Sequence, residues 1–501
     1  MMRKLPVIYV RGYAGGTSGI DRQVDDPFYG FNDGSTHVRV DGDGDPKFYQ
    51  FESPLLRLMI DEDYDLIVKG GQRAFLESAK DGEVPPETIW IHRFYDSAAT
   101  TYGQKPIEFE LETAAQELLD LVLLVRAKTG APAVYLVAHS MGGLICRCML
   151  QKICREHQPP YDPTDLVAKL FTYATPHGGI AFERGGGLLE WARDTFGPNG
   201  SDIFGPTRMF QYLTPGVDAG ASPPHGWDPR AMKGSDFPPD RVFCLIGTNP
   251  SDYGAALGLS SAVVGAKSDG LVQIENAYVP DASNAFVHRS HSGRYGVVNS
   301  EEGYQNLRRF LFGAYKVQVE YVSLQLEQKQ DVHWQGEVRL SVRGLPVVMH
   351  EQLAAHYCPV QLEEEMHKVD SADAPIPLVT TFLLKSGRES GISRYALHLR
   401  VISLREHNGF FDWTDHLEQT ADWDDILIVD VGRDAADQFT AWHAWNSEVV
   451  GAISDYERIG DKLKLEPGEP GGIRGTVPLP EAARPMLGAA VALRLTISAW
   501  S

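Results

Sequence analysis

The pattern of apolar and polar residues changes near residue 315. Before that point, short apolar runs alternate with segments in which apolar residues recur at helical spacing. The first run is PVIYV at residues 6–10, and residues 110–128 carry a helical stripe that Thr129 and Gly130 end. Further runs rich in strand-forming residues lie at residues 88–95, 133–137, 169–174 and 241–247. Strands that alternate with helices in this order predict a mainly parallel sheet with crossover helices.

Two long segments interrupt this order. Residues 17–82 are irregular and polar, with clusters of Asp and Gly, and we expect them to be an insertion in the fold. Residues 177–240 are rich in Gly, Pro and aromatic residues and are too long for an ordinary connection. We expect this second segment to be functional or to form a small subdomain of its own.

From residue 316 onward, apolar residues alternate with polar ones at period two, as in strands with one buried face. The clearest alternations run over Val338, Leu340 and Val342, over Leu397, Leu399 and Val401, and over Val491, Leu493, Leu495 and Ile497. They predict an antiparallel, β-sandwich-like domain over residues 316–501, after an α/β domain over residues 1–315. A chain of 501 residues, 43% of them hydrophobic, is long enough for two domains.

Charge and composition indicate which binding partners and which cellular compartment the sequence favours. The formal net charge of −21 disfavours nucleic acid as a partner, because nucleic acid attracts clusters of Lys and Arg. No apolar stretch reaches the roughly 18 residues of a transmembrane helix, and the run after Met-Met-Arg-Lys is too short for a signal peptide. The five cysteines form no dense disulfide framework. We therefore expect a cytoplasmic protein without a transmembrane segment; export by a dedicated secretion system would leave the same sequence pattern.

A candidate nucleophile follows the predicted strand at 133–137. In Ala-His-Ser-Met-Gly, small residues lie two positions before and after Ser140, which permits a strained turn from strand to helix that exposes the serine hydroxyl. So short a pattern also arises by chance, and Ala-Lys-Ser-Asp-Gly at 266–270 matches it too. No comparable helix pattern follows Ser268, whereas Ser140 lies between a strand-like run and a helix-compatible run. We therefore identify Ser140 as the candidate.

The segment Ala-His-Ser-Met-Gly-Gly at 138–143 resembles the nucleophile elbow of bacterial lipases and related α/β-hydrolases, including deacylases that act on lipid-anchored proteins. The resemblance is one of motifs and covers about the first 315 residues. It implies an α/β-hydrolase fold and a Ser-His-Asp triad whose members follow in the chain order Ser, Asp, His. No cofactor is required for such chemistry.

Two downstream segments resemble the acid and base loops of that family. Ser-Asp-Gly-Leu-Val at 268–272 makes Asp269 the candidate acid, which would orient the imidazole, with a surface turn as the alternative. In Phe-Val-His-Arg-Ser-His-Ser-Gly at 286–293, the order His-x-Gly makes His291 the candidate base, and His288 stays open.

An oxyanion hole needs two backbone N–H donors. One donor would be the N–H of Met141, directly after the nucleophile. The other would come from Tyr13, because Arg11-Gly-Tyr-Ala resembles the family's His-Gly-x-x loop, although Arg11 departs from the usual His.

The segment after the predicted strand at 169–174 begins with Thr175-Pro-His, which resembles a Thr-Pro-His motif of lipases. Beyond it lie the large apolar residues Leu188, Leu189, Trp191, Phe196, Phe204, Phe210 and Tyr212. They predict a lid or acyl-chain pocket, or a packed subdomain that covers the sheet, and the two do not exclude each other.

One acidic loop has the spacing of a calcium site. Asp-Gly-Asp-Gly-Asp at 41–45 is followed by Glu52 at the distance of a bidentate carboxylate. Pro46 stands where such a loop requires glycine, and proline cannot supply a positive φ. We therefore expect a solvated loop and no bound metal.

Together these features predict a serine hydrolase that cleaves carboxylic esters, with an acyl or lipid ester as substrate. An acyltransferase or a thioesterase would use the same triad. A non-catalytic interaction protein that works through its C-terminal β domain is the third alternative, because a fold alone does not establish activity. The C-terminal tryptophans, among them Trp423 and Trp445, fit either a lipid or glycan surface or the core, and core is the commoner use.

Overall fold

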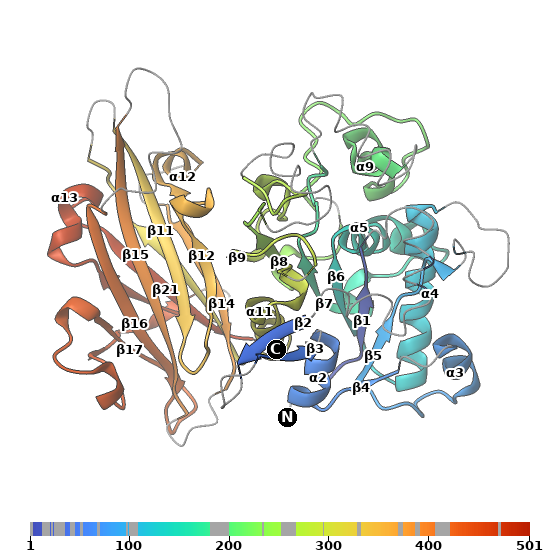
Figure 1. Ribbon diagram of the computed structural model, residues 1–501, viewed down its shortest axis with the longest axis horizontal. Coiled ribbons are helices and arrows are strands. Elements are labelled where there is room, and N and C mark those ends of the chain that lie inside the picture. Colours follow the sequence, from blue (N-terminus) through green and yellow to red (C-terminus); the bar gives the residue numbers. More distant parts are fainter. Residues whose placement is uncertain are drawn as a thin grey trace. The chain divides into compact units, whose positions relative to one another are not determined.

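One seven-stranded sheet organises the N-terminal part of the computed structural model (Figure 1). In sheet order its strands are β4 (Asp65–Leu66), β5 (Thr88–Ile91), β1 (Val7–Val10), β6 (Val134–His139), β7 (Val167–Tyr173), β8 (Val242–Gly247) and β9 (Ser283–Val287). Neighbouring strands from β4 to β8 pair in parallel. Every residue of β1, β5 and β8 is buried, which explains why these strands are uninterrupted apolar runs in the sequence. The predicted parallel α/β arrangement is confirmed.

Among the described residues, the helices of this part are α2 (Pro54–Glu62), α3 (Gln72–Ser78), α4 (Leu111–Thr129), α5 (Met141–Cys148), α6 (Cys154–Glu156), α7 (Pro163–Leu166), α9 (Pro206–Leu213) and α11 (Glu301–Phe312). The π-helical turn η2 (Met149–Ile153) joins α5 to α6. α4 packs against α5 with its apolar stripe buried, and it ends at Gly130, whose φ of 61° favours glycine. The helical stripe therefore marks both the face and the end of α4.

Residues 17–82, predicted to be an insertion, contribute one strand to the sheet. β4 lies at the sheet edge beside β5, and α2 and α3 flank it in the sequence. An antiparallel hairpin of β2 (Thr36–Val40) and β3 (Pro46–Gln50) is separate from this sheet. β4 has only two residues, which explains why no alternation or apolar run reveals it.

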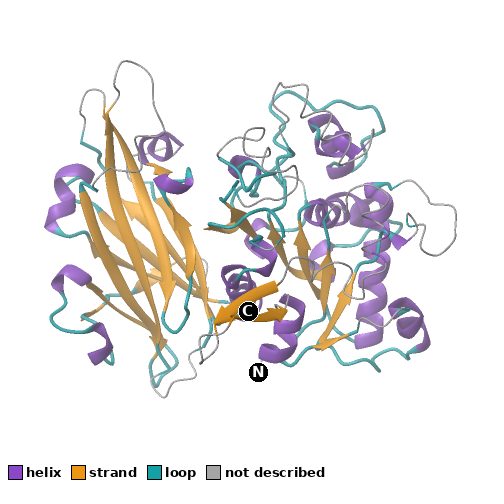
Figure 2. Cartoon of the chain, viewed as in Figure 1, coloured by secondary structure: helices purple, strands orange, loops and turns teal. Residues whose placement is uncertain are grey.

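The C-terminal part is built from antiparallel sheets (Figure 2). One sheet has the order β14 (Ile376–Leu383), β10 (Tyr315–Val322), β21 (Ala492–Ala499), β20 (Gly472–Pro478) and β19 (Glu466–Gly468). The other has β12 (Val348–Gln352), β11 (Val332–Val342), β15 (Ser393–Arg405), β16 (Trp423–Arg433), β17 (Phe439–Trp445) and β18 (Asp461–Lys462), with β13 (Val360–Gln361) paired to β11. The described residues of this part also form the short helices α12 (Leu362–Lys368) and α13 (Arg484–Leu487).

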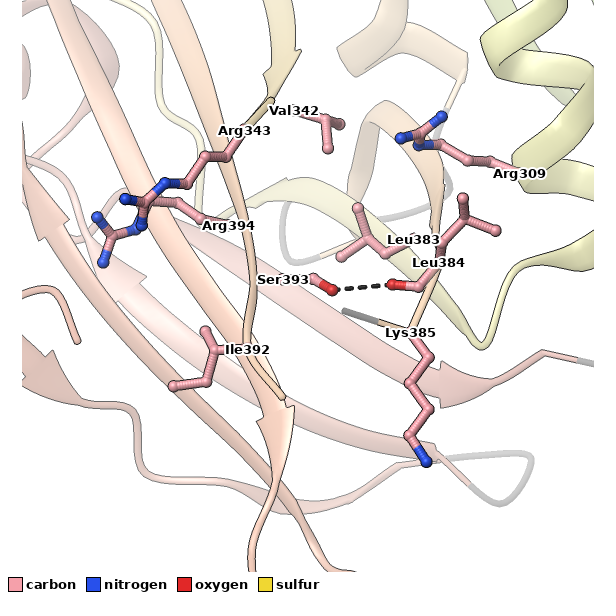
Figure 3. A pocket seen from close by; sticks show the side chains of 9 residues that line it. All are labelled: Arg309, Val342, Arg343, Leu383, Leu384, Lys385, Ile392, Ser393 and Arg394. Carbon is pink, nitrogen blue, oxygen red and sulfur yellow. Dashed lines mark hydrogen bonds between the residues drawn. The ribbon is translucent and has the colours of Figure 1, made fainter. Parts of the chain in front are cut away.

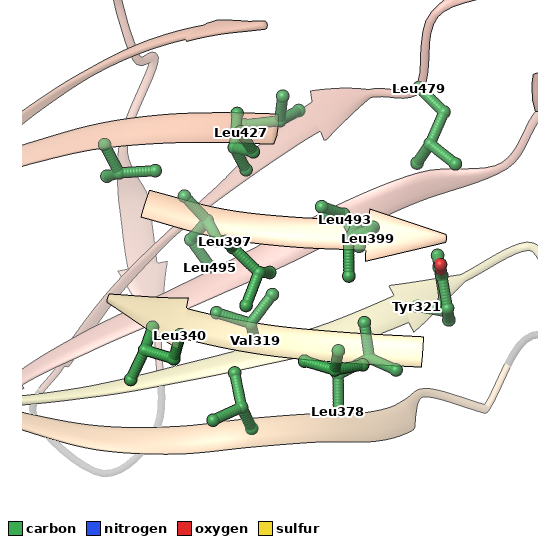
Figure 4. Close-up of a cluster of buried hydrophobic side chains, with 14 of the residues drawn as sticks. Val319, Tyr321, Leu340, Leu378, Leu397, Leu399, Leu427, Leu479, Leu493 and Leu495 are labelled. Atoms are coloured by element: carbon green, nitrogen blue, oxygen red, sulfur yellow. The ribbon is translucent and has the colours of Figure 1, made fainter. Parts of the chain in front are cut away.

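Both antiparallel sheets contribute to one apolar core (Figure 4). Val319 and Leu495 come from the first sheet, and Leu340, Leu397 and Leu427 come from the second. Buried and partly exposed residues alternate along β10, as the period-two pattern requires. Truncating one such leucine to Ala would cost about 2–5 kcal/mol of unfolding free energy. The predicted antiparallel β fold of this part is confirmed.

The chain divides into two compact units, one of Met1–Asn284 with Arg289–Tyr304 and the other of Ala285–His288 with Gln305–Ser501. The structure describes residues 4–12, 21, 24, 36–40, 46–50, 54–67, 71–96, 99, 109–180, 200–232, 235–251, 267–293, 295–327, 332–368, 374–385, 391–405, 421–468 and 472–500. Within these ranges, no helix combines the length and the apolar character needed to cross a membrane.

Candidate active site

Ser140 lies at a sharp turn between β6 and α5. β6 ends at His139 and α5 begins at Met141, so a single residue makes the turn. Ser140 has a φ of 53° and a ψ of −128°, and residues with a side chain rarely adopt such a φ. Its N–H donates to the carbonyl of Tyr173 at 2.9 Å, which holds the turn against β7. Backbone strain of this kind is concentrated at functional residues.

Close backbone contacts explain the small residues around Ser140. A Cβ on Gly142 would lie 2.2 Å from the carbonyl oxygen of Val10, and a Cβ on Gly12 would lie 2.6 Å from the Cβ of Ser140. Neither neighbour is the end of a flexible side chain, so neither can move aside. The loop after β1 therefore lies directly against the turn, and only glycine fits at these two positions.

The structure brings Ser140, Asp269 and His291 into one hydrogen-bonded chain. His291 Nε2 lies 2.9 Å from Ser140 Oγ, and His291 Nδ1 lies 2.9 Å from Asp269 Oδ2. An ionised carboxylate only accepts hydrogen bonds, so Nδ1 carries the imidazole proton and Nε2 accepts from the serine hydroxyl. This arrangement can remove the hydroxyl proton as the serine oxygen attacks a substrate.

Backbone N–H groups fix the carboxylate of Asp269. Its Oδ1 accepts from the N–H of Leu271 at 3.0 Å and from that of Val272 at 2.8 Å, which leaves Oδ2 for His291. The N–H of His291 in turn donates to the carbonyl of Asp269 at 2.9 Å. Asp269 is buried, so it does not lie in the exposed turn that was the alternative.

The other serine and the other histidine lie elsewhere. Ser268 is buried, and its Oγ accepts from the N–H of Gly270 at 3.2 Å within the acid loop. Ser268 forms an isolated antiparallel β-bridge with Gln273 and does not lie at a strand-to-helix turn. The ring of His288 stacks on that of His356, with ring centroids 3.7 Å apart. Neither residue takes part in the hydrogen bonds that connect Ser140, His291 and Asp269.

Only one of the two expected oxyanion donors lies in the described part of the chain. Met141 is the first residue of α5, and the first N–H groups of a helix have no partner within it. Tyr13 lies outside the described residues, as do Asp41, Asp43, Asp45 and Glu52 of the acidic loop. The described residues include no group of three or more His, Cys, Asp or Glu side chains that could hold a metal ion.

The Thr-Pro-His motif contacts the turn through its threonine. Thr175 Oγ1 donates to the carbonyl of Ser140 at 2.9 Å. The histidine of the motif, His177, is fully buried, with its Nε2 3.1 Å from Thr172 Oγ1. Burial lowers the pKa of His177 well below its ordinary value, and the charge of Arg147 acts in the same direction. His177 is therefore a neutral structural residue, whereas Thr175 supports the candidate nucleophile.

Arg147 is a residue that no sequence motif singles out. It is fully buried in α5 and donates to the carbonyls of His177 at 3.0 Å and Pro229 at 2.9 Å. It also donates to Gln151 Oε1 at 2.9 Å. The guanidinium thus ties the helix after Ser140 to the segment at 177–240. Apart from Gln151, these partners are main-chain carbonyls far away in the sequence, which explains why the sequence carries no signal for Arg147.

The described part of the 177–240 segment packs against the sheet's helix layer. α9 contacts α5, and its residues Met209, Tyr212 and Leu213 are buried. A Cβ on Gly179 would lie 2.3 Å from the carbonyl oxygen of Phe204, so this segment also packs on the loop after β7. The apolar residues Leu188, Leu189, Trp191 and Phe196 lie outside the described residues. The described part accordingly forms a packed subdomain.

A cavity of about 130 Å³ in the C-terminal unit is rich in basic side chains (Figure 3). Arg394 is already paired, because its Nε and one terminal nitrogen donate to Asp430 at 2.6 and 2.7 Å. In Figure 3 the amino group of Lys385 points away from the side chains of Arg343 and Arg394. The hydroxyl of Ser393 donates to the Leu384 carbonyl at 2.9 Å and has no histidine beside it in the lining. This lining contains no nucleophile paired with a base.

No protein-family model matches the chain, and no curated protein matches it. Among solved structures, a gene product of Listeria innocua is similar to this chain at 14% identity and a TM-score of 0.27. The alignment covers 62% of this chain and 94% of the Listeria chain. A protein of Lactobacillus plantarum, named as a candidate cell surface hydrolase, aligns with 62% of this chain and 92% of its own, at 12% identity and a TM-score of 0.25. At these scores the likenesses carry no weight for function, which therefore depends on the geometry around Ser140.

Proposed function

We propose that the chain is a serine hydrolase that cleaves carboxylic esters through an acyl-enzyme intermediate. The observation that carries the proposal is the hydrogen-bonded chain from Ser140 through His291 to Asp269, with both contacts at 2.9 Å. The strained φ of Ser140 and the exclusion of side chains at Gly12 and Gly142 support it, because both place the hydroxyl at the end of a rigid turn.

In the first half of the reaction, Ser140 Oγ attacks the ester carbonyl carbon while His291 Nε2 takes the hydroxyl proton. Asp269 holds the imidazole by Nδ1 and stabilises the imidazolium that forms. The tetrahedral intermediate then expels the alcohol, which leaves with the proton from Nε2. The acyl group remains on Ser140.

In the second half, water replaces the alcohol. His291 Nε2 takes a proton from water as its oxygen attacks the acyl carbonyl, and then returns the proton to Ser140 Oγ as the carboxylic acid leaves. The negative oxygen of both intermediates would accept from the N–H of Met141 and from that of Tyr13. Each such donor contributes about 3–4 kcal/mol of transition-state stabilisation.

The substrate class that we propose is an acyl or lipid ester. The resemblance of residues 138–143 to lipase elbows supports it, as does the concentration of large apolar residues in the 177–240 segment. In this proposal part of that segment covers the acyl chain as a lid. No cofactor takes part, because the triad supplies both the nucleophile and the proton transfer.

The test is hydrolysis of p-nitrophenyl esters of increasing acyl length by the wild type and by Ser140→Ala, with the folding of both checked by circular dichroism. We expect Ser140→Ala to lower turnover by a factor on the order of 10⁴–10⁶. A rate that rises with acyl length would support the lipid ester. Equal activity in both folded proteins would overturn the assignment of Ser140 as the nucleophile, and absent activity in both would favour a non-catalytic interaction protein.

A further inference from the structure

His139 precedes Ser140 and contacts the main chain of His291. Its Nε2 lies 3.0 Å from the carbonyl oxygen of His291, and the two ring centroids are 5.2 Å apart. On its other side, Nδ1 lies 3.3 Å from the position that a Cβ on Gly12 would take. The imidazole of His139 therefore fills the space between the loop after β1 and the loop that carries His291.

The contact with a carbonyl fixes the tautomer of His139. A carbonyl oxygen only accepts hydrogen bonds, so Nε2 must carry the proton. Burial lowers the pKa of His139 well below its ordinary value, and the positive charge of Arg11 acts in the same direction, as does that of His291 when it is protonated. The side chain is therefore a neutral donor in the resting enzyme.

We propose that His139 is a positioning residue for the reaction: as a neutral imidazole, it holds the main chain of His291 so that Nε2 stays in line with Ser140 Oγ. This inference rests on the proposed function. It assigns no proton transfer to His139 itself. Its hydrogen bond adds a third constraint on His291, beside the contact of Nδ1 with Asp269 and the N–H bond to the Asp269 carbonyl.

A neutral donor suits this position because His291 becomes cationic during each half of the proposed reaction. Asp269 faces that cation from one side and stabilises it, whereas Arg11 is a cation near His139. A second cation on His139 would oppose the imidazolium. The histidine therefore combines a hydrogen-bond donor with the absence of charge, and glutamine combines the same two properties at a similar reach.

The experiment compares His139→Leu and His139→Gln in the full chain. The first variant removes the donor and keeps an apolar side chain, and the second keeps a neutral donor. The control is His157→Leu, because His157 Nδ1 also lies 2.8 Å from a main-chain carbonyl, that of Pro159, but at the end of α6. For each protein we would measure the rate of covalent modification of Ser140 by a fluorophosphonate, and kcat and KM for p-nitrophenyl butyrate.

We expect His139→Leu to slow the modification of Ser140 and to lower kcat by about 10- to 100-fold with KM little changed, because a small misplacement of a base has effects of this size. His139→Gln should recover most of the rate, and His157→Leu should match the wild type. If His139→Leu does not fold, His139→Asn replaces it, because the shorter amide does not reach the His291 carbonyl.

The outcomes separate this inference from the proposed function. A wild type that is not modified at Ser140 would overturn the proposed function. Modification of wild type and His139→Leu at equal rates would overturn the positioning role and leave the proposed function standing. Failure of His139→Gln to recover the rate, with the variant folded, would also contradict the role as a neutral donor.

Discussion

The two units use their buried polar groups in different ways. In the N-terminal unit, the hydroxyl of Ser140 contacts His291, which in turn contacts Asp269, in the arrangement that we propose activates Ser140 as a nucleophile. In the C-terminal unit, the buried residues Arg394 and Asp430 pair with each other, because Arg394 donates to both carboxylate oxygens of Asp430. Burial of polar groups alone thus does not indicate a reaction site.

What distinguishes the N-terminal unit is the order of the groups and not their number. A hydroxyl, an imidazole beside it and a carboxylate that orients the imidazole are the groups, in order, that nucleophilic catalysis needs. In an ion pair such as Arg394–Asp430, the two charged groups satisfy each other's hydrogen bonds. The C-terminal tryptophans agree with this difference. Trp423 and Trp445 are buried in the core with ring centroids 5.8 Å apart, so these two do not form a lipid or glycan surface.

The largest expected effect tests whether His291 is the base in the hydrogen-bonded series of Ser140, His291 and Asp269 in the N-terminal unit. His291→Gln should lower ester turnover by a factor on the order of 10⁴–10⁶, because the nucleophile loses its base. The matched variant His288→Gln should retain turnover, since that ring stacks on His356 and not on Ser140. Steady-state kinetics on a p-nitrophenyl ester would measure both, and a larger loss in His288→Gln would contradict the assignment of the base.

The next effect tests the buried Arg394–Asp430 ion pair in the C-terminal unit. Asp430→Asn should lower the unfolding free energy by about 3–5 kcal/mol, because it leaves the buried guanidinium of Arg394 uncompensated. Urea unfolding followed by tryptophan fluorescence would measure it. Ester turnover of the folded variant should not change.

The control is an exposed ion pair of the same unit. Lys368 Nζ lies 2.6 Å from Glu365 Oε1, and 63% of the lysine side chain is exposed. Glu365→Gln should therefore cost less than about 1 kcal/mol. Equal losses of unfolding free energy in Asp430→Asn and Glu365→Gln would show that burial does not determine how much the Arg394–Asp430 pair contributes to stability.

A smaller effect should be common to both units. Burial lowers the pKa of His92 in the first unit and of His350 in the second to about 4, from an ordinary value of 6.5. Between those values the unfolded chain binds protons that the folded chain does not, so stability is complete above pH 6.5 and is lost as the pH falls towards 4. The loss is on the order of 3 kcal/mol for each histidine.

His92→Gln should remove the part of this acid dependence that belongs to His92. Glutamine has no titratable group and can still donate to the carbonyl of Ala114, which His92 Nε2 contacts at 2.8 Å. Urea unfolding at pH 7 and pH 5 would measure the difference in stability. An unchanged difference in the variant would mean that His92 is not buried in the neutral state.

The smallest effect concerns Thr175. Thr175→Val removes the hydroxyl that donates to the Ser140 carbonyl, but that carbonyl still accepts from the N–H of Gly143 at 3.0 Å. We expect a loss of about 1 kcal/mol of stability and a few-fold loss of kcat. Thermal unfolding and kinetics together would measure it, with Thr175→Ser as the variant that keeps the hydroxyl. A loss in kcat as large as that of His291→Gln would instead give Thr175 a direct part in the reaction.

Features that depend on local pattern were predictable from the sequence. Strands β1 and β6 are apolar runs because both faces of the sheet are covered, whereas residues 338–342 of β11 and 395–401 of β15 alternate because there only one face is buried. The turn at Ser140 has a local signature as well, since small residues are required where α5 meets the loop after β1. The chain order Ser, Asp, His came from the resemblance of three short motifs, and the structure brings those three residues together.

Features that depend on distant partners were not predictable. β4 has two residues and exists only through its pairing with β5, so residues 17–82 were expected to be an insertion. Arg147 binds carbonyls far along the chain, and the role of His139 depends on the carbonyl of His291, 152 residues away. No periodicity or motif records such contacts, because each partner is an ordinary main-chain group.

The most direct test of the account is to trap the acyl-enzyme. The wild type would be mixed with a p-nitrophenyl ester, quenched in acid within the first turnover and digested for peptide mass spectrometry. We expect an added acyl mass on the peptide that contains Ser140, and none on that peptide in Ser140→Ala. An acyl mass on Ser268, or ester cleavage by wild type and Ser140→Ala at the same rate, would contradict it.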